Sequence, residues 1–365
     1  MTTQQPALFQ PIALGDIQLK HRVVMAPMTR LRADDETAVP SDSTLKYYQQ
    51  RASDGGLIIT EGTVPLSEGK GWHHSPGIWS KDQIKGWRNI TDAVHGKGGK
   101  VICQSFAAGR VADPTCAPVV YVPSDLNDPT PGTPKPPLKV MTVDDIKRNI
   151  HEFVQGARNC IEAGFDGVEI HCANGYLLDQ FIHSNSNQRT DDYGGTLLNR
   201  FRFPIEVIRE VFTAIGPGKV GVRISPFSTF QGMRDPHDPA GLFLSFITAV
   251  LDATDGLAYI HAVMPRANGA DDQDPSKLVE KDDLEPIRQL DAEKYGDLIA
   301  FGRFFTLLAN PDLPKRIKND WPFIKYDRNS FYTQSIEGYT DWSEYQVTHQ
   351  YESSYPDGEA VTVSA

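Results

Sequence analysis

The sequence predicts an α/β fold, a TIM-type (β/α)8 barrel in which the seventh strand is missing or irregular. Strand-like and helical patterns alternate along the chain, which is how a parallel sheet is built. No Gly-x-Gly-x-x-Gly motif follows the first strand, so a closed barrel is favoured over a doubly wound sheet. At 365 residues the chain is long enough for one such barrel, and we expect a single domain over residues 1–365.

Short β-rich runs are the predicted strands, and the longer amphipathic patterns between most of them are the predicted helices. The strands are His21–Ala26, Leu57–Thr60, Lys100–Gln104, Gly167–His171, Val220–Ile224, Ala258–His261 and Leu298–Phe301. The helices are Thr44–Ser53, Ser80–Lys97, Thr142–Ala163, Asn199–Ile215 and Pro239–Asp252.

One strand of a complete barrel is not found. After Val263, residues 264–297 contain no run of three or more β-forming residues, and Asp282–Tyr295 is more typical of a helix. Strand number and stagger are linked, so seven strands cannot close with the usual geometry. Either an irregular segment fills the gap or the wall is open there.

Two segments exceed a minimal barrel. Pro114–Pro137 holds eight prolines and follows the third strand, so it is either a lid or substrate-contact loop over the barrel mouth or a solvated insertion. The tail over residues 321–365 is rich in aromatic residues, and we expect it to pack across the barrel.

The composition excludes several classes of protein. A net charge of −11 argues against nonspecific nucleic-acid binding, which needs a basic face. The four cysteines have no CxxC spacing, and we expect buried thiols. No secretion signal and no run of 18 apolar residues is found, so we expect a cytoplasmic protein without a membrane anchor.

The fourth predicted strand ends with three polar side chains, His171, Asn174 and Tyr176. The carboxyl ends of barrel strands carry the chemistry. His and Asn can hydrogen-bond a carbonyl oxygen, and a tyrosine hydroxyl can give up a proton. The alternative is that these are ordinary polar residues of a turn.

Several motifs in order resemble the Old Yellow Enzyme family of FMN-dependent ene-reductases, in its fungal branch. They are Met25-Ala-Pro-Met-Thr-Arg30, Ile58-Ile-Thr-Glu-Gly62, Gln104-Ser-Phe-Ala-Ala-Gly-Arg110, His171-Cys-Ala-Asn-Gly-Tyr-Leu-Leu-Asp-Gln-Phe181, Asn187-Gln-Arg-Thr-Asp-Asp-Tyr-Gly-Gly195, Gly221-Val-Arg-Ile-Ser-Pro226 and Ala300-Phe-Gly-Arg303. The resemblance extends from Leu8 to about Tyr345.

The resemblance implies an FMN site. Thr29 would contact the flavin edge, Pro27 and Gly62 would place backbone against the ring, and Gln104 would face its pyrimidine edge. Arg223 would lie at the N1/O2 side, and Gly302 and Arg303 would contact the phosphate. A strand-end cap for Thr29 and a structural ion pair for Arg223 are the alternatives.

The resemblance also implies a substrate site. His171 and Asn174 would hold the oxygen of an α,β-unsaturated carbonyl, an enone or enal, and Tyr176 would protonate the α-carbon. Phe106 and Tyr332 would line the pocket, and NAD(P)H would be the reductant. No metal is implied, the protein would be a monomer or homodimer, and fungal secondary metabolism is the implied setting.

The chain departs from the family pattern at three places. Ser105-Phe106 replaces Leu-Trp, the Gly-Gly turn after the seventh strand has no counterpart, and Phe304–Ala309 is longer than usual. Three hypotheses stay open. The chain is an FMN-dependent oxidoreductase, a flavin-independent isomerase or cyclase that uses the same His, Asn and Tyr, or a non-catalytic relic that lost a strand.

Overall fold

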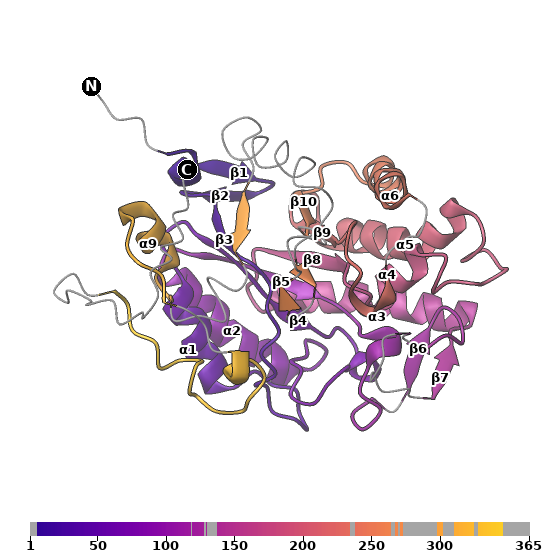
Figure 1. The fold of residues 1–365 in the computed structure, drawn as a ribbon, viewed down its shortest axis with the longest axis horizontal. Helices are drawn as coiled ribbons and strands as arrows, with labels where there is room; N and C mark the ends of the chain where they lie inside the picture. The colour runs from indigo at the N-terminus through magenta and orange to yellow at the C-terminus, as the bar shows by residue number, and fades with distance from the viewer. Residues whose placement is uncertain are drawn as a thin grey trace.

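The central element is one curved sheet of seven parallel strands (Figure 1). The computed structural model describes residues 6–117, 119–127, 129, 137–233, 238–263, 267–268, 271–272, 298–301, 310–324 and 328–345. The strands are β3 (Val23–Met25), β4 (Leu57–Thr63), β5 (Lys100–Ser105), β8 (Gly167–Cys172), β9 (Val220–Ile224), β10 (Tyr259–Ala262) and β13 (Ile299–Phe301). Their order in the sheet is β10-β9-β8-β5-β4-β3-β13. The α/β class and all seven predicted strands are confirmed.

The two ends of this sheet are β10 and β13, and within the described ranges no strand joins them. Between them in the chain, β11 (Ala267–Asn268) and β12 (Asp271–Asp272) form a separate antiparallel pair. Most of the chain between them lies outside the described residues, so the predicted break stays a prediction. The helix expected at Asp282–Tyr295 lies outside them.

Helices cover the outside of the sheet (Figure 1). They are α1 (Asp42–Arg51), α2 (Lys81–His95), α3 (Val143–Glu162), α5 (Leu197–Ile215) and α6 (Pro239–Ala253). Capping boxes at Ser80 with Gln83 and at Thr142 with Asp145 fix where α2 and α3 begin. Short 3-10 turns are found at Ala7–Phe9, Ser67–Gly69, Gly109–Val111, Phe230–Gly232 and Arg328–Ser330.

The core lies between the strands and the helices. Outward-facing Val168 and Ile170 of β8 are fully buried, as are Phe153 of α3 and Phe203 of α5. All four cysteines are free thiols; Cys103, Cys160 and Cys172 are buried as expected, whereas Cys116 is only partly buried. Among the described residues, no helix combines the length and the apolar composition that a bilayer-spanning segment needs.

A hairpin of β1 (Ile12–Leu14) and β2 (Ile17–Leu19), which the sequence analysis missed, covers the amino-terminal ends of the strands. Gly15 makes its turn with φ of +54°, and an added Cβ there would lie 2.2 Å from the Gly218 oxygen. The hairpin packs on apolar residues that face the sheet interior, including Val24, Ile59 and Ile102. The opposite end of the interior carries the polar side chains.

The proline-rich excursion contributes to the wall beside that polar end. Its β6 (Val120–Val122) pairs in parallel with β7 (Leu138–Val140). Val120 and Val122 are buried in a cluster that includes Phe106, with Tyr176 packed against it. This part is therefore not a solvated insertion, whereas residues 130–136 lie outside the described chain.

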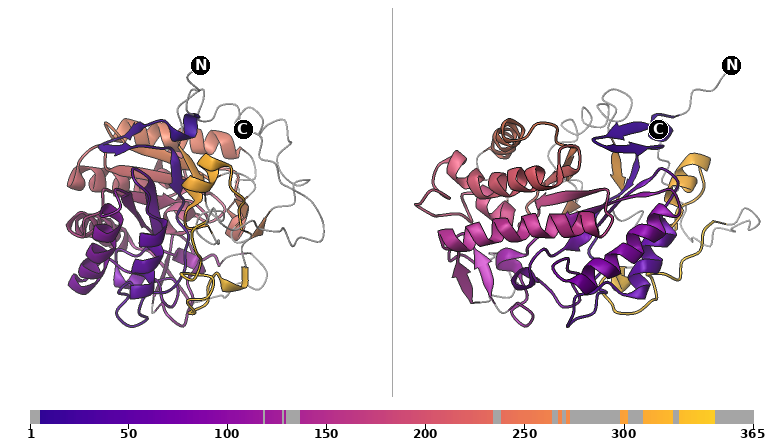
Figure 2. Two further views of the ribbon diagram at one scale, coloured as in Figure 1. Left: turned by 90° about the vertical axis from the view of Figure 1, so that its left-hand side faces the viewer. Right: turned by 180° about the vertical axis from the view of Figure 1, so that it is seen from behind.

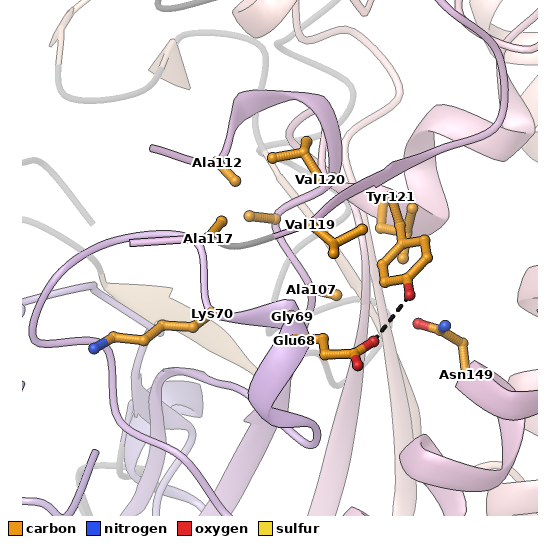
Figure 3. Close-up of a pocket in the computed structure, with 13 residues that line it drawn as sticks. Glu68, Gly69, Lys70, Ala107, Ala112, Ala117, Val119, Val120, Tyr121 and Asn149 are labelled. Atoms are coloured by element: carbon orange, nitrogen blue, oxygen red, sulfur yellow. Dashed lines mark hydrogen bonds between the residues drawn. The ribbon is translucent and has the colours of Figure 1, made fainter. Parts of the chain in front are cut away.

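A small cavity lies beside β6, where the Tyr121 hydroxyl donates to Glu68 Oε2 at 2.9 Å (Figure 3). The Asn149 side chain points toward the same space in this view. Its volume of about 10 Å³ leaves room for no more than one water. It is therefore too small for a flavin or a substrate.

The described part of the carboxy-terminal segment packs on α1 and on the loop after β3. It follows α9 (Leu313–Asn319), which lies at the opposite end of the molecule from β6 and β7 (Figures 1 and 2). Arg30 Nε donates to the Phe331 oxygen at 3.2 Å, and Arg51 Nη2 donates to the Tyr339 oxygen at 3.3 Å. The Tyr339 ring stacks on Tyr47 with centroids 4.3 Å apart. These contacts bring Phe331 and its neighbour to the barrel mouth.

Candidate active site

Polar residues of four adjacent strands face the sheet interior at two levels. At the lower level, the strand register aligns Gln104, Glu169, Gly221 and Tyr259 on β5, β8, β9 and β10. Two residues further along, it aligns His171, Arg223 and His261. Side chains two residues apart in a strand share a face, so both levels lie inside the sheet.

Glu169 is the centre of the lower level. Its Oε1 accepts a hydrogen bond from Gln104 Nε2 at 2.7 Å. Its Oε2 accepts one from the Tyr259 hydroxyl at 3.0 Å and lies 2.9 Å from His261 Nδ1. Burial raises the pKa of Glu169, but the charge and hydrogen bond of His261 and the charge of Arg223 outweigh burial and leave the pKa below its ordinary value. The carboxylate is therefore ionised although its side chain is fully buried.

Gly221 explains how Tyr259 reaches across one strand to Glu169. A Cβ on Gly221 would lie 2.2 Å from the Tyr259 ring, so the ring occupies the place of a side chain. Because position 221 of β9 has no side chain, the Tyr259 hydroxyl on β10 can hydrogen-bond to Glu169 on β8.

His171 lies at the upper level and is buried, with 3% of its surface exposed. Burial lowers the pKa of His171 well below its ordinary value, and the positive charges of Arg223 and His261 lower it further. The imidazole is therefore neutral at physiological pH and keeps one N–H donor.

Asn174 and Tyr176 are positioned by a turn between β8 and α4 (Leu177–Ile182). Asn174 and Gly175 have φ of +60° and +78°, a conformation that asparagine and glycine tolerate best. The Gly175 N–H donates to Asp179 Oδ2 at 2.8 Å, and the Asn174 N–H donates to Ser225 Oγ at 2.7 Å. Tyr176 is the N-cap residue of α4. The turn thus returns the chain so that Tyr176 faces His171.

Aromatic rings form one wall of the site. The rings of His171 and Tyr176 meet edge to face with centroids 5.1 Å apart. The centroid of the Phe106 ring lies 5.4 Å from that of Tyr176 and 6.4 Å from that of His171. Trp72 stacks on Phe106 with ring centroids 6.0 Å apart. These contacts leave little freedom for the Tyr176 ring.

The Tyr176 phenol stays protonated. Burial, and secondarily the neighbouring Tyr332, raise the pKa of Tyr176 to about 12, while Arg223 and a hydrogen bond to Gln231 oppose this shift. Tyr332 itself is half exposed, at 52%. The Gln231 amide nitrogen, turned toward its acceptors, donates to the Asn174 and Gly175 oxygens at 3.2 and 3.0 Å. The loop after β9 thereby supports the turn that carries Tyr176.

Thr29 and Pro27 lie in the segment after β3. That strand ends at Met25, so Thr29 is four residues beyond the strand, not at its end as predicted. The next residues anchor the segment, because Glu61 Oε2 accepts the N–H groups of Arg30 at 3.0 Å and Leu31 at 3.3 Å. Pro27 is buried and Thr29 is partly exposed.

A bulge in β4 places Gly62 beside Gln104. The register with β5 shifts between Ile59 and Gly62, and the Gln104 N–H donates to the Thr60 hydroxyl at 3.1 Å. A Cβ on Gly62 would lie 2.8 Å from the Phe106 ring. Glycine is therefore needed here for the aromatic wall to approach the backbone.

The described residues thus bring part of the predicted site together. Tyr176 lies against both His171 and Phe106, and Gln104 and Arg223 surround Glu169 from neighbouring strands. Gly302 and Arg303, the expected phosphate contacts, lie outside the described chain, so that prediction stays a prediction.

Several site residues were missed by the sequence analysis. They are Glu169, Tyr259, His261, Trp72 and Gln231. Glu169, Tyr259 and His261 could have been found from the alternation of side chains between the two faces of a strand. Glu169 precedes His171 by two residues, and Tyr259 precedes His261 by two, so each pair had to share a face.

The site can be tested for its fit to a flavin ring. Two buried nitrogen atoms, His171 Nδ1 and Arg223 Nε, have no hydrogen-bond partner among the described residues. Such atoms are costly in a folded protein unless a ligand or water satisfies them. A planar ring with acceptor atoms suits Arg223, and a carbonyl oxygen suits His171. No cluster of potential metal ligands is found in the described ranges.

A parallel α/β barrel wall with polar side chains at the carboxyl ends of its strands is the arrangement of a barrel enzyme. The chain belongs to the NADH:flavin oxidoreductase / NADH oxidase family, whose model matches residues 7–323. The resemblance to the Old Yellow Enzyme family is confirmed, as is an enzyme of the ene-reductase type.

Individual relatives agree with this assignment. The chain is 41% identical to a chanoclavine-I aldehyde reductase of Penicillium roqueforti over 92% of this chain and 95% of the relative. It is 39% identical to 12-oxophytodienoate reductase 1 of Oryza sativa subsp. japonica over 92% of each chain. The solved structure of an old yellow enzyme homologue from Zymomonas mobilis is similar with a TM-score of 0.81 and 34% identity, covering 93% of this chain and 99% of that one.

Proposed function

We propose that the protein reduces the activated C=C bond of an α,β-unsaturated carbonyl compound, with FMN as the cofactor and NAD(P)H as the reductant. The observation that carries this proposal is the neutral, buried His171 with an unpartnered nitrogen, held edge to face against the protonated Tyr176. One residue can polarise a carbonyl oxygen and the other can deliver a proton.

The ring would be held on the polar interior of the sheet. Gln104 offers an amide and Arg223 a guanidinium on neighbouring sides of Glu169, and Thr29, Pro27 and Gly62 line the approach from β3 and β4. When bound, FMN supplies hydride transfer. The positive charge of Arg223 would stabilise negative charge that accumulates on a reduced ring.

His171 and Asn174 would hold the substrate oxygen. Because His171 is neutral, it donates a hydrogen bond through an N–H that is too weakly acidic to be transferred to the substrate. Asn174 is held by a turn whose backbone is fixed by Ser225 and Asp179. Hydrogen bonds to the oxygen withdraw electron density from the conjugated bond and favour addition at its far carbon.

Tyr176 would protonate the α-carbon. Its raised pKa keeps the phenol in the acid form across physiological pH. A carbon that has become basic by gaining a hydride at its neighbour can still take this proton. Phe106 and Tyr332 would bound the substrate on the aromatic side.

The substrate is proposed to be a small enone or enal. His171 and Tyr176 support this proposal, as do the relatives' names, which include an aldehyde reductase. We further propose a role in fungal secondary metabolism, a cytoplasmic location, and a single domain acting as monomer or homodimer.

An anaerobic titration tests the proposal. The protein reconstituted with FMN should lose its flavin absorbance on addition of NADPH or NADH and regain it on addition of an enone such as 2-cyclohexenone. Failure of the enone to restore the absorbance would reject this function.

A flavin-independent isomerase or cyclase is the second candidate, and the lack of a seventh strand pattern in the sequence of residues 264–297 favours it. A changed wall beside the site could leave His171, Asn174 and Tyr176 to move protons without redox chemistry. Turnover of a carbonyl compound that continues after flavin and nicotinamide are removed would support this candidate. Strict dependence on both would exclude it.

A further inference from the structure

Glu169 is a fully buried carboxylate to which the proposed mechanism gives no role. It receives hydrogen bonds from side chains of β5 and β10, on either side of its own strand β8. Burying an ionised carboxylate is costly unless its oxygen atoms are well satisfied. We therefore asked what function a buried charge at the base of the site could have.

The carboxylate fixes the orientation of Gln104. An ionised carboxylate only accepts hydrogen bonds, so the Gln104 amide must turn its nitrogen toward Glu169 Oε1, 2.7 Å away. The amide oxygen of Gln104 consequently faces another direction. An amide without this partner could flip and exchange its donor and acceptor positions.

The carboxylate also sets the charge of the site. Arg223 lies one level above Glu169 on the neighbouring strand, and the two charges attract. The Glu169 carboxylate thus offsets one positive charge, that of Arg223, in the interior of the sheet.

We propose that Glu169 is a positioning residue that presents Gln104 and Arg223 to the flavin ring in fixed orientation and limits the positive charge that the ring meets. This inference rests on the proposed FMN-dependent function. Gly221 and Tyr259 are part of the same device, because the missing side chain at Gly221 lets the Tyr259 hydroxyl reach the carboxylate.

The substitution Glu169→Gln tests the proposal, because it keeps the shape and removes the charge. Affinity for FMN, measured by quenching of flavin fluorescence on titration of the apoprotein, should fall about tenfold. The reduction potential of the bound flavin should rise, because removing a negative charge favours the reduced, negatively charged ring. A tenfold preference for the reduced form corresponds to about 30 mV for a two-electron couple.

The matched control is Glu210→Gln on α5, whose side chain is 46% exposed and pairs with the adjacent Arg209. It should leave affinity and potential unchanged. A purely structural role for Glu169 would lower the unfolding midpoint without raising the potential, so an unchanged or lower potential in Glu169→Gln overturns the proposal.

If the Glu169→Gln variant does not fold, the Tyr259→Phe variant tests the same proposal. It keeps the carboxylate and removes the hydroxyl that disperses its charge, so the potential should shift in the opposite direction, downward. No change in potential or affinity would overturn the proposal. If the wild-type protein binds no FMN at all, the proposed function itself fails, which is a separate outcome.

Discussion

Removing the Tyr176 hydroxyl should separate the two half-reactions. In Tyr176→Phe the ring keeps its contacts to His171 at 5.1 Å, Phe106 at 5.4 Å and Trp72 at 5.8 Å, so the wall of the site persists. Only the proton donor is lost. A positioned general acid contributes about 10² to 10⁴ in rate, or roughly 3 to 5 kcal/mol of barrier.

Stopped-flow absorbance measures each half-reaction. In Tyr176→Phe, flavin reduction by NADPH should proceed at the wild-type rate, whereas reoxidation by an enone should slow by about 10² to 10⁴. Tyr193→Phe is the control, because this phenol bonds to Glu206 on α5 and has a pKa that is likewise raised to about 12 by burial and Glu206. Equal slowing of both half-reactions, or no slowing of reoxidation, would refute Tyr176 as the acid.

Three further predictions follow from the same geometry. The rate of flavin reoxidation by an enone should be independent of pH between about 6.5 and 9. Tyr176 loses its proton only near its pKa of about 12, and His171 gains one only well below its ordinary pKa. A bell-shaped profile within this range would contradict both assignments. Gly221→Ala should lower the free energy of unfolding in urea by about 1 to 3 kcal/mol, since its Cβ would overlap the Tyr259 ring, and an unchanged midpoint would contradict that overlap. Arg30→Ala should lower the free energy of unfolding by about 3 kcal/mol and expose the carboxy-terminal segment to proteolysis, because the Phe331 oxygen loses a buried donor. Resistance to protease equal to that of the wild-type protein would count against this.

Much of the fold could be read from local patterns. The β5 and β9 strands are buried on both faces, so their apolar runs stand out at Lys100–Ser105 and Val220–Ile224. The hairpin β1–β2 and α4 were missed because each is short. The α4 helix has six residues, and its start depends on the left-handed turn at Asn174 and Gly175, which becomes visible only in three dimensions.

The candidate site was predictable where a strand end carries polar residues, as at His171 and Asn174. The resemblance to a known family then supplied Thr29, Gln104 and Arg223 as expectations. What could not be read was the contact between strands. That Tyr259 reaches Glu169 depends on the register of β10 against β9 and on the empty position at Gly221, both of which are properties of the assembled sheet.

A flavin ring should bind against Gln104 and Arg223, beside His171. Titration of the purified apoprotein with FMN and, separately, with riboflavin tests it most directly, because riboflavin carries the ring without the phosphate. We expect saturable quenching of flavin fluorescence by both ligands, with weaker affinity in Arg223→Ala for each. Absence of saturable binding by either ligand, or an affinity unaffected by Arg223→Ala, would contradict it.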